Sequence, residues 1–290
     1  MQWINALIQG LLLGGLYALL ASGLSLMFGV MRIVNLAHGT FAVLAAYLGL
    51  IIVQEFDVSP VIAIIVVVPV MAALGYAVQR GLFNLSLKRG GLSPLLVAFG
   101  LAVVLTQGLQ EVFSADTQSI PIGALAGESF EIAGDLFIGV FPLITFVIGV
   151  LVVLALQVFL SKFALGRAMR AASDDSEAVT LMGIDNKQVY ALSTAIAFAT
   201  VGLAGLLIGM RTQFSPTFGD AILIFAFEAV IIGGLGSLWG TLIGGLVLGC
   251  AQTIGAQINP SYGVLAGHLV FLAILAFRPS GLLPKVVSSR

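Results

Sequence analysis

Nine long apolar stretches separated by short loops constrain what this chain can fold into. A helix that crosses a membrane needs about 20 mostly apolar residues, and the nine stretches approach or exceed that length. They cover residues 6–30, 38–54, 60–82, 93–113, 138–160, 188–210, 219–234, 238–257 and 262–277. Each is expected to be a helix, because unpaired backbone groups are costly in lipid. The sequence therefore predicts an all-α integral membrane protein, a polytopic bundle of about nine transmembrane helices forming one transmembrane domain over residues 1–290.

The composition agrees with this fold class and argues against an enzyme. Charged residues make up only 9% of the chain, whereas about 25% is usual for a soluble domain. Cys250 is the one cysteine, so a disulfide framework or a cysteine-based metal site is excluded. The two histidines lie in separate spans, and no catalytic group of residues is recognisable. We therefore expect no enzymatic activity, no metal site, no cofactor of its own and no nucleic-acid partner.

The loop charges predict the orientation of the spans. Eleven of the twelve basic residues fall on one side of the nine-span map, and only Arg211 falls on the other. The eleven are Arg32, Arg80, Lys88, Arg89, Lys162, Arg167, Arg170, Lys187, Arg278, Lys285 and Arg290. The opposite loops carry the acids Glu55, Asp57, Asp116, Glu128, Glu131, Asp135 and Asp220. By the positive-inside rule, the N-terminus is expected outside and the C-terminus in the cytoplasm. Eight spans are the alternative, and residues 219–257, with the break Gly233-Gly-Leu-Gly-Ser237, are where the count stays open.

Two loops stand out. The external loop at about 114–137 has four acids and no basic residue, which suits a small lid or a docking edge. The cytoplasmic loop at about 162–187 is the charged part of an almost chargeless protein, since seven of the 25 charged residues lie within 166–187. Such a loop between spans is typical of a contact with a cytosolic partner.

A short helix with defined ends is predicted within the cytoplasmic loop. Asp174 is expected to cap its start, with Glu177 closing a capping box three residues later. Gly183 stands where a glycine ends a helix, and Ile184 is placed to pack back on it. At 100° per residue Ala172, Val179 and Met182 share one side. A short helix with an apolar stripe fits a groove on a partner protein, while a solvated linker that only enforces topology is the alternative.

Few polar side chains lie at membrane depth. Glu228 is the one acid well inside a predicted span, where an ionised carboxylate costs a few kcal/mol (about 2.5 to 3.5 for Asp). It is expected to line a cavity or gate beside the break formed by Gly233, Gly234 and Gly236, or to hydrogen-bond a neighbouring helix; His268 is expected to be structural. Asn35, His38 and Gly39 join the first two spans and suit a helix break, which lines the substrate path in many transporters; a capping or packing role is the alternative.

The glycine-rich string at 233–249 is not a nucleotide site. A P-loop needs lysine directly after the second glycine of its motif, followed by Ser or Thr. The four lysines, Lys88, Lys162, Lys187 and Lys285, follow Leu, Ser, Asn and Pro. By that route this chain cannot be an ATPase.

Several motifs together resemble one family. They are Asn35-Leu-Ala-His-Gly39, Gly166-Arg-Ala-Met-Arg-Ala171, Glu177-Ala-Val-Thr-Leu-Met-Gly-Ile184, Gly233-Gly-Leu-Gly-Ser237 and Arg278-Pro-Ser-Gly-Leu282. In this order, over essentially the whole chain, the sequence resembles the permease subunit of bacterial high-affinity branched-chain amino-acid ABC importers.

The resemblance implies a multi-pass protein of the bacterial inner membrane that works with a second related permease subunit, two cytoplasmic ATP-binding subunits and a periplasmic solute-binding protein. It implies alternating access driven by the partner ATPases, which bind the ATP. Importer permeases carry a coupling loop of the pattern Glu-Ala-Ala-x-x-x-Gly, which Glu177-Ala178-Val179 and Gly183 fit with one substitution. The residues assigned to ATPase coupling are Arg167, Arg170, Asp174, Glu177, Ala178, Gly183 and Ile184.

The resemblance leaves the solute open. Relatives of this family carry branched-chain amino acids, urea, short amides or aromatic acids, and the binding protein does much of the selecting. Which residues contact the solute, and whether the permease pairs with itself or with a relative, also stay open. A self-sufficient channel or proton-coupled secondary transporter is the competing class, with Glu228 as its best support.

Overall fold

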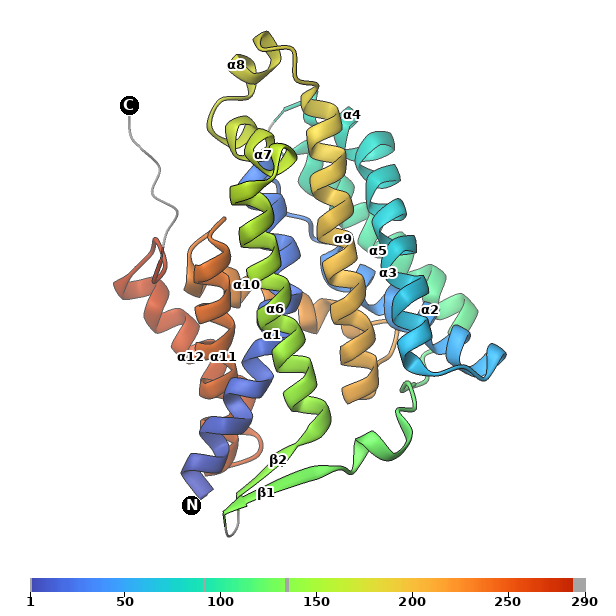
Figure 1. Cartoon of the computed structure of the whole chain (residues 1–290), viewed down its shortest axis with the longest axis vertical. Helices are drawn as coiled ribbons and strands as arrows, with labels where there is room; N and C mark the ends of the chain where they lie inside the picture. The colour runs from blue at the N-terminus through green and yellow to red at the C-terminus, as the bar shows by residue number, and fades with distance from the viewer. Residues whose placement is uncertain (1, 91, 134–135, 284–290) are drawn as a thin grey trace. The chain divides into compact units, whose positions relative to one another are not determined.

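The computed structural model describes residues 2–90, 92–133 and 136–283, and this part of the chain is helical apart from one antiparallel β-hairpin (Figure 1). The long helices are α1 (Gln2–Met31), α2 (His38–Phe56), α3 (Pro60–Val78), α5 (Ser93–Phe113), α6 (Val140–Lys162), α9 (Asn186–Arg211) and α11 (Leu238–Ile258). The shorter elements are the π-helix η1 (Gln79–Phe83), α4 (Asn84–Leu87), the 3₁₀-helix η2 (Gly123–Ala126), β1 (Ser129–Ala133), β2 (Leu136–Gly139), α7 (Ala164–Asp174), α8 (Ser176–Leu181), α10 (Phe218–Gly233) and α12 (Tyr262–Phe277). The all-helical membrane fold class is confirmed.

Seven of the predicted spans are helices long and apolar enough to cross a membrane within the described ranges. The predicted spans 219–234 and 262–277 also form helices, α10 and α12, but each has 16 residues. At 1.5 Å per residue they are about 24 Å long, short of the roughly 30 Å hydrocarbon core. The count of nine spans and the side of each terminus therefore stay predictions, and Lys285 and Arg290, which contributed to the orientation, lie outside the described residues.

The chain divides into two compact units, which are described separately. The first comprises residues 1–25, 122–154 and 225–290, and the second comprises residues 26–121 and 155–224. Three of the four boundaries fall inside α1, α6 and α10, and the fourth lies between α5 and η2.

In the first unit, glycines allow α1 and α11 to pack with their backbones in contact. A Cβ added to Gly249 would lie 2.5 Å from the backbone nitrogen of Gly14, and one added to Gly245 would lie 2.7 Å from the carbonyl oxygen of Gly14. Gly245 and Gly249 are four residues apart on one face of α11, which is the small-xxx-small spacing that brings helices together in lipid. The abundance of glycine in the sequence therefore reflects helix packing here.

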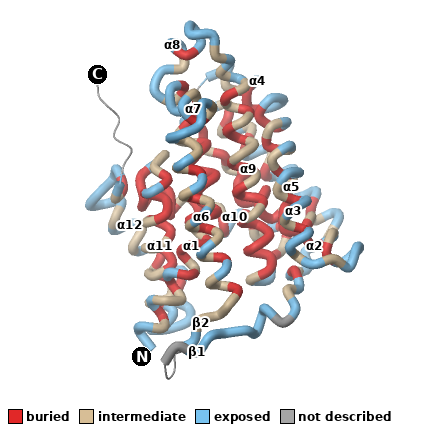
Figure 2. The backbone as a smooth tube through the Cα atoms, in the orientation of Figure 1, coloured by how far each residue is buried: buried red, intermediate tan, exposed pale blue. Residues whose placement is uncertain are grey.

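In the second unit, α9 is the central helix and packs along α2 and α3. Figure 2 shows α9 buried along most of its length, whereas α5 is largely exposed. Phe41 of α2 packs on Phe198 of α9 with ring centroids 4.3 Å apart. A buried hydrogen bond of 2.7 Å from Thr194 of α9 to Gln79 satisfies a polar side chain where α3 passes into the π-helix.

The predicted external loop has structure of its own. Residues Gln118 and Phe214 exchange two backbone hydrogen bonds of 2.8 Å, which ties the start of the loop to the segment after α9. Further along, η2 precedes the β1–β2 hairpin, in which Phe130 pairs with Ile138. Part of the loop is thus a β-hairpin, and its role as a lid or docking edge stays a prediction. Asp135, one of the predicted external acids, lies outside the described residues.

Candidate functional site

Gly166, Arg167 and Arg170 of the charged loop hold α7 against the end of α6. The guanidinium of Arg167 donates a hydrogen bond of 2.7 Å to the carbonyl of Lys162, and Arg170 donates one of 3.4 Å to the carbonyl of Ser161. These carbonyls belong to the last turn of α6, where helical partners are lacking. A Cβ at Gly166 would lie 2.6 Å from the Cα of Leu160. Both arginines therefore hold α7 in place, in addition to any contact they make with a partner.

The cap of α8 is Asp175, and the prediction that Asp174 caps this helix is wrong. The carboxylate of Asp175 accepts hydrogen bonds of 3.0 Å from the backbone N–H groups of Glu177 and Ala178. Asp174 is the last residue of α7, so the extended backbone that a cap requires falls one residue later. Glu177 is consequently the second helical residue rather than the third, and the predicted capping box does not form. Glu177 remains exposed in the first turn, where the helix dipole favours an acid.

The predicted end of α8 is confirmed. Gly183 has φ +84°, the left-handed conformation that glycine adopts without strain. Its N–H donates to the carbonyl of Thr180 at 3.0 Å, and the N–H of Ile184 donates to the carbonyl of Val179 at 3.2 Å. This pair of bonds is the Schellman motif, which satisfies the last carbonyls of a helix.

The tip of α8 presents apolar side chains to the surroundings. Leu181 is 90% exposed and Met182 is 78% exposed, whereas Val179 is 3% exposed. The predicted stripe of Ala172, Val179 and Met182 is therefore wrong in one member, because Met182 follows the last turn and points away from the buried face. Exposed apolar side chains at a loop tip are typical of a protein contact.

One asparagine joins α8 to the membrane helix that follows. The side-chain amide of Asn186, the first residue of α9, donates hydrogen bonds to the carbonyl of Ser176 at 2.5 Å and to the hydroxyl of Thr180 at 2.9 Å. Asp185 caps α9 by accepting from the N–H of Lys187 at 2.9 Å. Figure 1 shows α7 and α8 at the N-terminal end of α9, within the second unit. The two hydrogen bonds of Asn186 therefore connect α8 directly to the start of α9.

Replacing Asp175 by alanine is expected to loosen α8. Loss of an aspartate cap costs about 1 kcal/mol, which is roughly a fivefold rise in local opening. Hydrogen exchange of the amides in α8 measures this change, and Asp174→Ala is the matched control because it removes the same side chain one residue earlier. Faster exchange in Asp174→Ala than in Asp175→Ala would show that the cap is misassigned.

The predicted break between the first two spans is a tight junction in the second unit. Asn35 is fully buried, and its side-chain oxygen accepts a hydrogen bond of 3.0 Å from the N–H of Ala37. His38 is the first residue of α2 and is likewise buried. Gly39 lies against Gly219 at the start of α10, since a Cβ on Gly219 would be 3.1 Å from the carbonyl carbon of Gly39. These contacts give all three residues a part in packing, and their role in a solute path stays a prediction.

The second predicted break, Gly233 to Ser237, is the turn between α10 and α11 in the first unit. Gly234 and Gly236 have φ of +106° and +78°, and the hydroxyl of Ser237 caps α11 by accepting from the N–H of Gly240. A Cβ on Gly233 would lie 2.6 Å from the nitrogen of Thr241, so the two helices meet at their backbones.

The motif Arg278 to Leu282 closes this turn. The N–H groups of Leu282 and Leu283 donate to the carbonyls of Ile232 and Gly233 at 2.8 and 2.9 Å. A Cβ on Gly281, whose φ is +82°, would lie 2.5 Å from the Cα of Gly234. Two motifs separated in the sequence thus build one structure at the end of α10. The sequence alone gave no sign that they meet.

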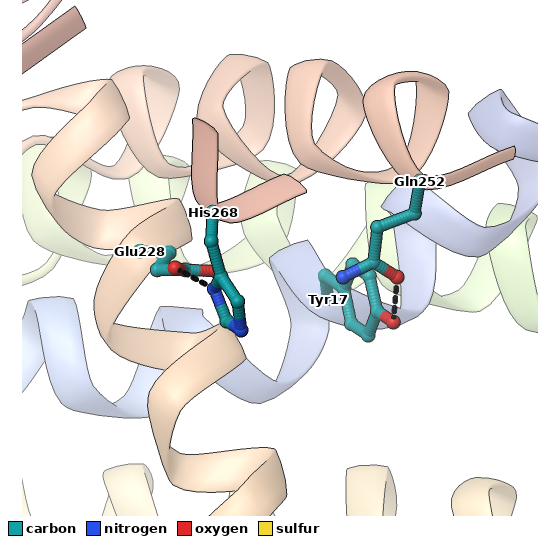
Figure 3. A network of polar contacts seen from close by, with 4 residues as sticks. All are labelled: Tyr17, Glu228, Gln252 and His268. Atoms are coloured by element: carbon teal, nitrogen blue, oxygen red, sulfur yellow. Dashed lines mark hydrogen bonds and ion pairs between the residues drawn. The ribbon is translucent and has the colours of Figure 1, made fainter. Parts of the chain in front are cut away.

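Glu228 of α10 is paired with His268 of α12 (Figure 3). The Nδ1 atom of His268 contacts Oε1 of Glu228, and the Glu228 side chain is 5% exposed against 37% for His268. A hydrogen bond to a neighbouring helix was one of the two roles predicted for Glu228, and this hydrogen bond is present. The second carboxylate oxygen is buried and has no hydrogen-bond partner among the described residues, so a place for a proton or a further polar group remains at this site.

Two more polar side chains share this part of the first unit. The hydroxyl of Tyr17 in α1 donates a hydrogen bond of 2.6 Å to Oε1 of Gln252 in α11. Phe225 lies beside both pairs, with its ring centroid 5.3 Å from that of Tyr17 and 6.2 Å from that of His268. Tyr17 was not anticipated from the sequence, because a single tyrosine in an apolar helix carries no pattern. No cluster of His, Cys, Asp and Glu able to hold a metal ion occurs in the described ranges.

Comparison with known proteins decides the family. The family model described as the permease component of the branched-chain amino acid transport system matches residues 6–276. This chain belongs to that family. The permease is 30% identical to the high-affinity branched-chain amino acid transport system permease protein BraD of Pseudomonas aeruginosa, over 98% of this chain and 96% of BraD.

Two Escherichia coli proteins are also similar to the permease. It is 26% identical to the permease protein LivH over 98% of this chain and 96% of LivH. It is also 26% identical to LivM over 93% of this chain and 68% of LivM. The resemblance seen in the motifs is confirmed, and the chain is a transport permease of the membrane rather than an enzyme.

Proposed function

We propose that this permease is a transmembrane subunit of an ATP-driven importer for branched-chain amino acids or related small solutes such as amides, urea and aromatic acids. The observation that carries the proposal is α8: a short helix with defined ends, joined to α9 by Asn186, exposes Leu181 and Met182 at its tip. BraD and LivH are permease proteins of branched-chain amino acid transport systems, and this supports the solute class.

The proposed coupling runs through the loop between α6 and α9. Partner ATPases bind ATP and close, and a groove on their surface holds the tip of α8. Asn186 passes the movement to α9, and Arg167 and Arg170 pass it through α7 to the end of α6. Through this connection the ATPases on one side of the membrane and the binding protein on the other can shift the same set of membrane helices between two conformations. Alternating access requires such a shared two-state change.

The proposed partners are two cytoplasmic ATP-binding subunits, a second permease and a solute-binding protein. Similarity to both LivH and LivM supports a pair of related permeases. The exposed β1–β2 hairpin is the proposed dock for the binding protein on the outer face. We further propose the inner membrane of a bacterium as the location, with ATP bound by the partner subunits and no cofactor in the permease itself.

The solute path is proposed to use the two glycine junctions as the places where the backbone changes. The first is Asn35 to Gly39, and the second is Gly233 to Gly236. Left-handed glycines at the second junction allow a change of backbone angle without a Cβ clash. Glu228 is proposed to influence the second junction from within α10, through its pairing with His268.

A proton-coupled transporter is the competing function, because Glu228 is a buried carboxylate with an unpartnered oxygen among the described residues. Replacing Glu228 by glutamine separates the two. In the complete transporter we expect Glu228→Gln to retain at least about half of the ATP-dependent uptake, since the amide preserves the shape and a hydrogen bond to His268.

Labelled leucine uptake into proteoliposomes, with ATP supplied on the side of the ATPases, measures this prediction. Uptake should require ATP and should be unaffected by a protonophore in both proteins. Uptake driven by a proton gradient without ATP, and lost in Glu228→Gln, would replace the importer with a proton-coupled carrier.

A further inference from the structure

A groove of about 380 Å³ lies in the second unit between the η1–α4 segment and α5. Its volume is within the range of ligand pockets, roughly 300–1,000 Å³. The apolar part of the lining consists of Leu82, Leu85, Leu96 and Val97. Leu85 and Leu96 are 59% and 66% exposed, so the groove opens outward from the chain.

The shape of the groove is set by the π-helical turn and by glycine. One wall begins at Gly81, where an added Cβ would meet no atom within 4 Å. Hydrogen bonds of Gln79 fix the π-helical turn to α4 and α9. Gln79 donates one of 3.1 Å to Asn84 and accepts one of 2.7 Å from Thr194. The open space beside Gly81 is therefore a fixed feature of the fold.

The polar part of the lining lies where the helical hairpin turns. Arg89 follows α4 and Ser93 begins α5, whereas Gly81 and Val97 lie further along the two antiparallel segments. No hydrogen bond or ion pair joins the guanidinium of Arg89 to another described residue. Arg89 therefore places a positive charge at one end of an apolar groove.

We propose that this groove binds an anionic phospholipid, with the phosphate on Arg89 and one acyl chain along Leu82, Leu85 and Leu96. Charge at one end and apolar side chains at the other match the two parts of a lipid. The predicted topology puts Arg89 on the cytoplasmic side, where the leaflet is negatively charged and basic pockets between helices bind lipid headgroups. α5 is largely exposed along its apolar length, which leaves the opening of the groove accessible to lipid.

Native mass spectrometry of the purified full-length permease, titrated with dioleoyl phosphatidylglycerol or dioleoyl phosphatidylcholine, tests the proposal. We expect one phosphatidylglycerol to bind with an affinity on the order of fivefold higher than that of phosphatidylcholine. This is the preference for an anionic lipid that one basic side chain near a membrane surface provides. Arg89→Gln should remove this preference. Gly81→Leu should weaken binding of both lipids, because the leucine side chain fills the space of the acyl chain.

Two controls make the result decisive. Lys162→Gln removes one positive charge from the end of α6, on the same predicted side but outside the groove, and should keep the preference. Dihexanoyl phosphatidylglycerol, which has the same headgroup and short chains, should bind more weakly than the dioleoyl lipid. Equal binding of the two dioleoyl lipids, or an unchanged preference in Arg89→Gln, would overturn the proposal. Loss of the bound lipid when the permease is purified with its protein partners would also overturn it, by assigning the groove to a subunit contact.

Discussion

Replacing Gly183 by isoleucine is expected to abolish solute uptake while the permease remains inserted in the membrane. Gly183 has φ +84°, a conformation that costs a non-glycine residue about 1–2 kcal/mol and a β-branched one more. No atom lies within 4 Å of an added Cβ, so the effect comes from the backbone alone. The Schellman bonds of Gly183 and Ile184 would be lost, and the tip with Leu181 and Met182 would no longer be held in place.

Uptake of labelled leucine by the complete transporter, normalised to the amount of permease in the membrane, measures this effect. Gly183→Asn is the matched control, since asparagine tolerates the left-handed conformation, and it should retain most of the uptake. Glu177→Lys should also abolish uptake, because it places a positive charge in the exposed first turn of α8. Normal uptake by well-expressed Gly183→Ile would remove α8 from the coupling mechanism.

Replacing Gly39 by leucine is expected to prevent folding of the second unit. The Cβ would be driven into the backbone of Gly219 and would lie 3.0 Å from the Cβ of Leu223, so α2 and the start of α10 must separate. Overpacking usually costs about 1–3 kcal/mol, and a clash with the backbone of Gly219 is expected to reach the upper end of that range. The yield of monodisperse protein in detergent should fall to less than about a tenth of that of the unaltered protein.

The matched control for this substitution is Gly108→Leu. Gly108 also lies within a helix, α5, but an added Cβ meets no atom within 4 Å there. Size-exclusion chromatography and the thermal midpoint of the purified protein report on both variants. Equal yields and midpoints for Gly39→Leu and Gly108→Leu would mean that the contact between Gly39 and Gly219 does not support the fold.

The membrane fold was predictable because the sequence shows directly how long each apolar stretch is. The ends of most spans agree with the helices within a few residues, and α8 was predicted with its glycine terminus. Its cap was placed one residue early because Asp174 and Asp175 are equally good capping residues, and α7 continues through Asp174. Which of two adjacent aspartates caps a helix depends on where the preceding helix ends, and local patterns do not determine that.

Contacts between distant segments were not predictable. Asn186 joins α9 to α8, and His268 pairs with Glu228 across 40 positions of sequence. Leu282 is hydrogen-bonded to the end of α10 through its backbone. A backbone hydrogen bond does not depend on the type of side chain, so the sequence cannot indicate it. Each of these contacts depends on helix packing, for which the sequence supplies glycines and small residues but not the pairs that meet.

The proposed function requires α8 to connect this permease to a cytoplasmic ATPase. The most direct test purifies the tagged chain from its native membranes in mild detergent and identifies the associated proteins by mass spectrometry. The proposed coupling through α8 predicts that a P-loop ATPase and a second related permease purify with the unaltered chain. It predicts loss of the ATPase alone when Leu181, 90% exposed at the tip of α8, is replaced by aspartate. A stable chain that purifies alone or as a simple homo-oligomer, or a Leu181→Asp variant that keeps the ATPase, would contradict it.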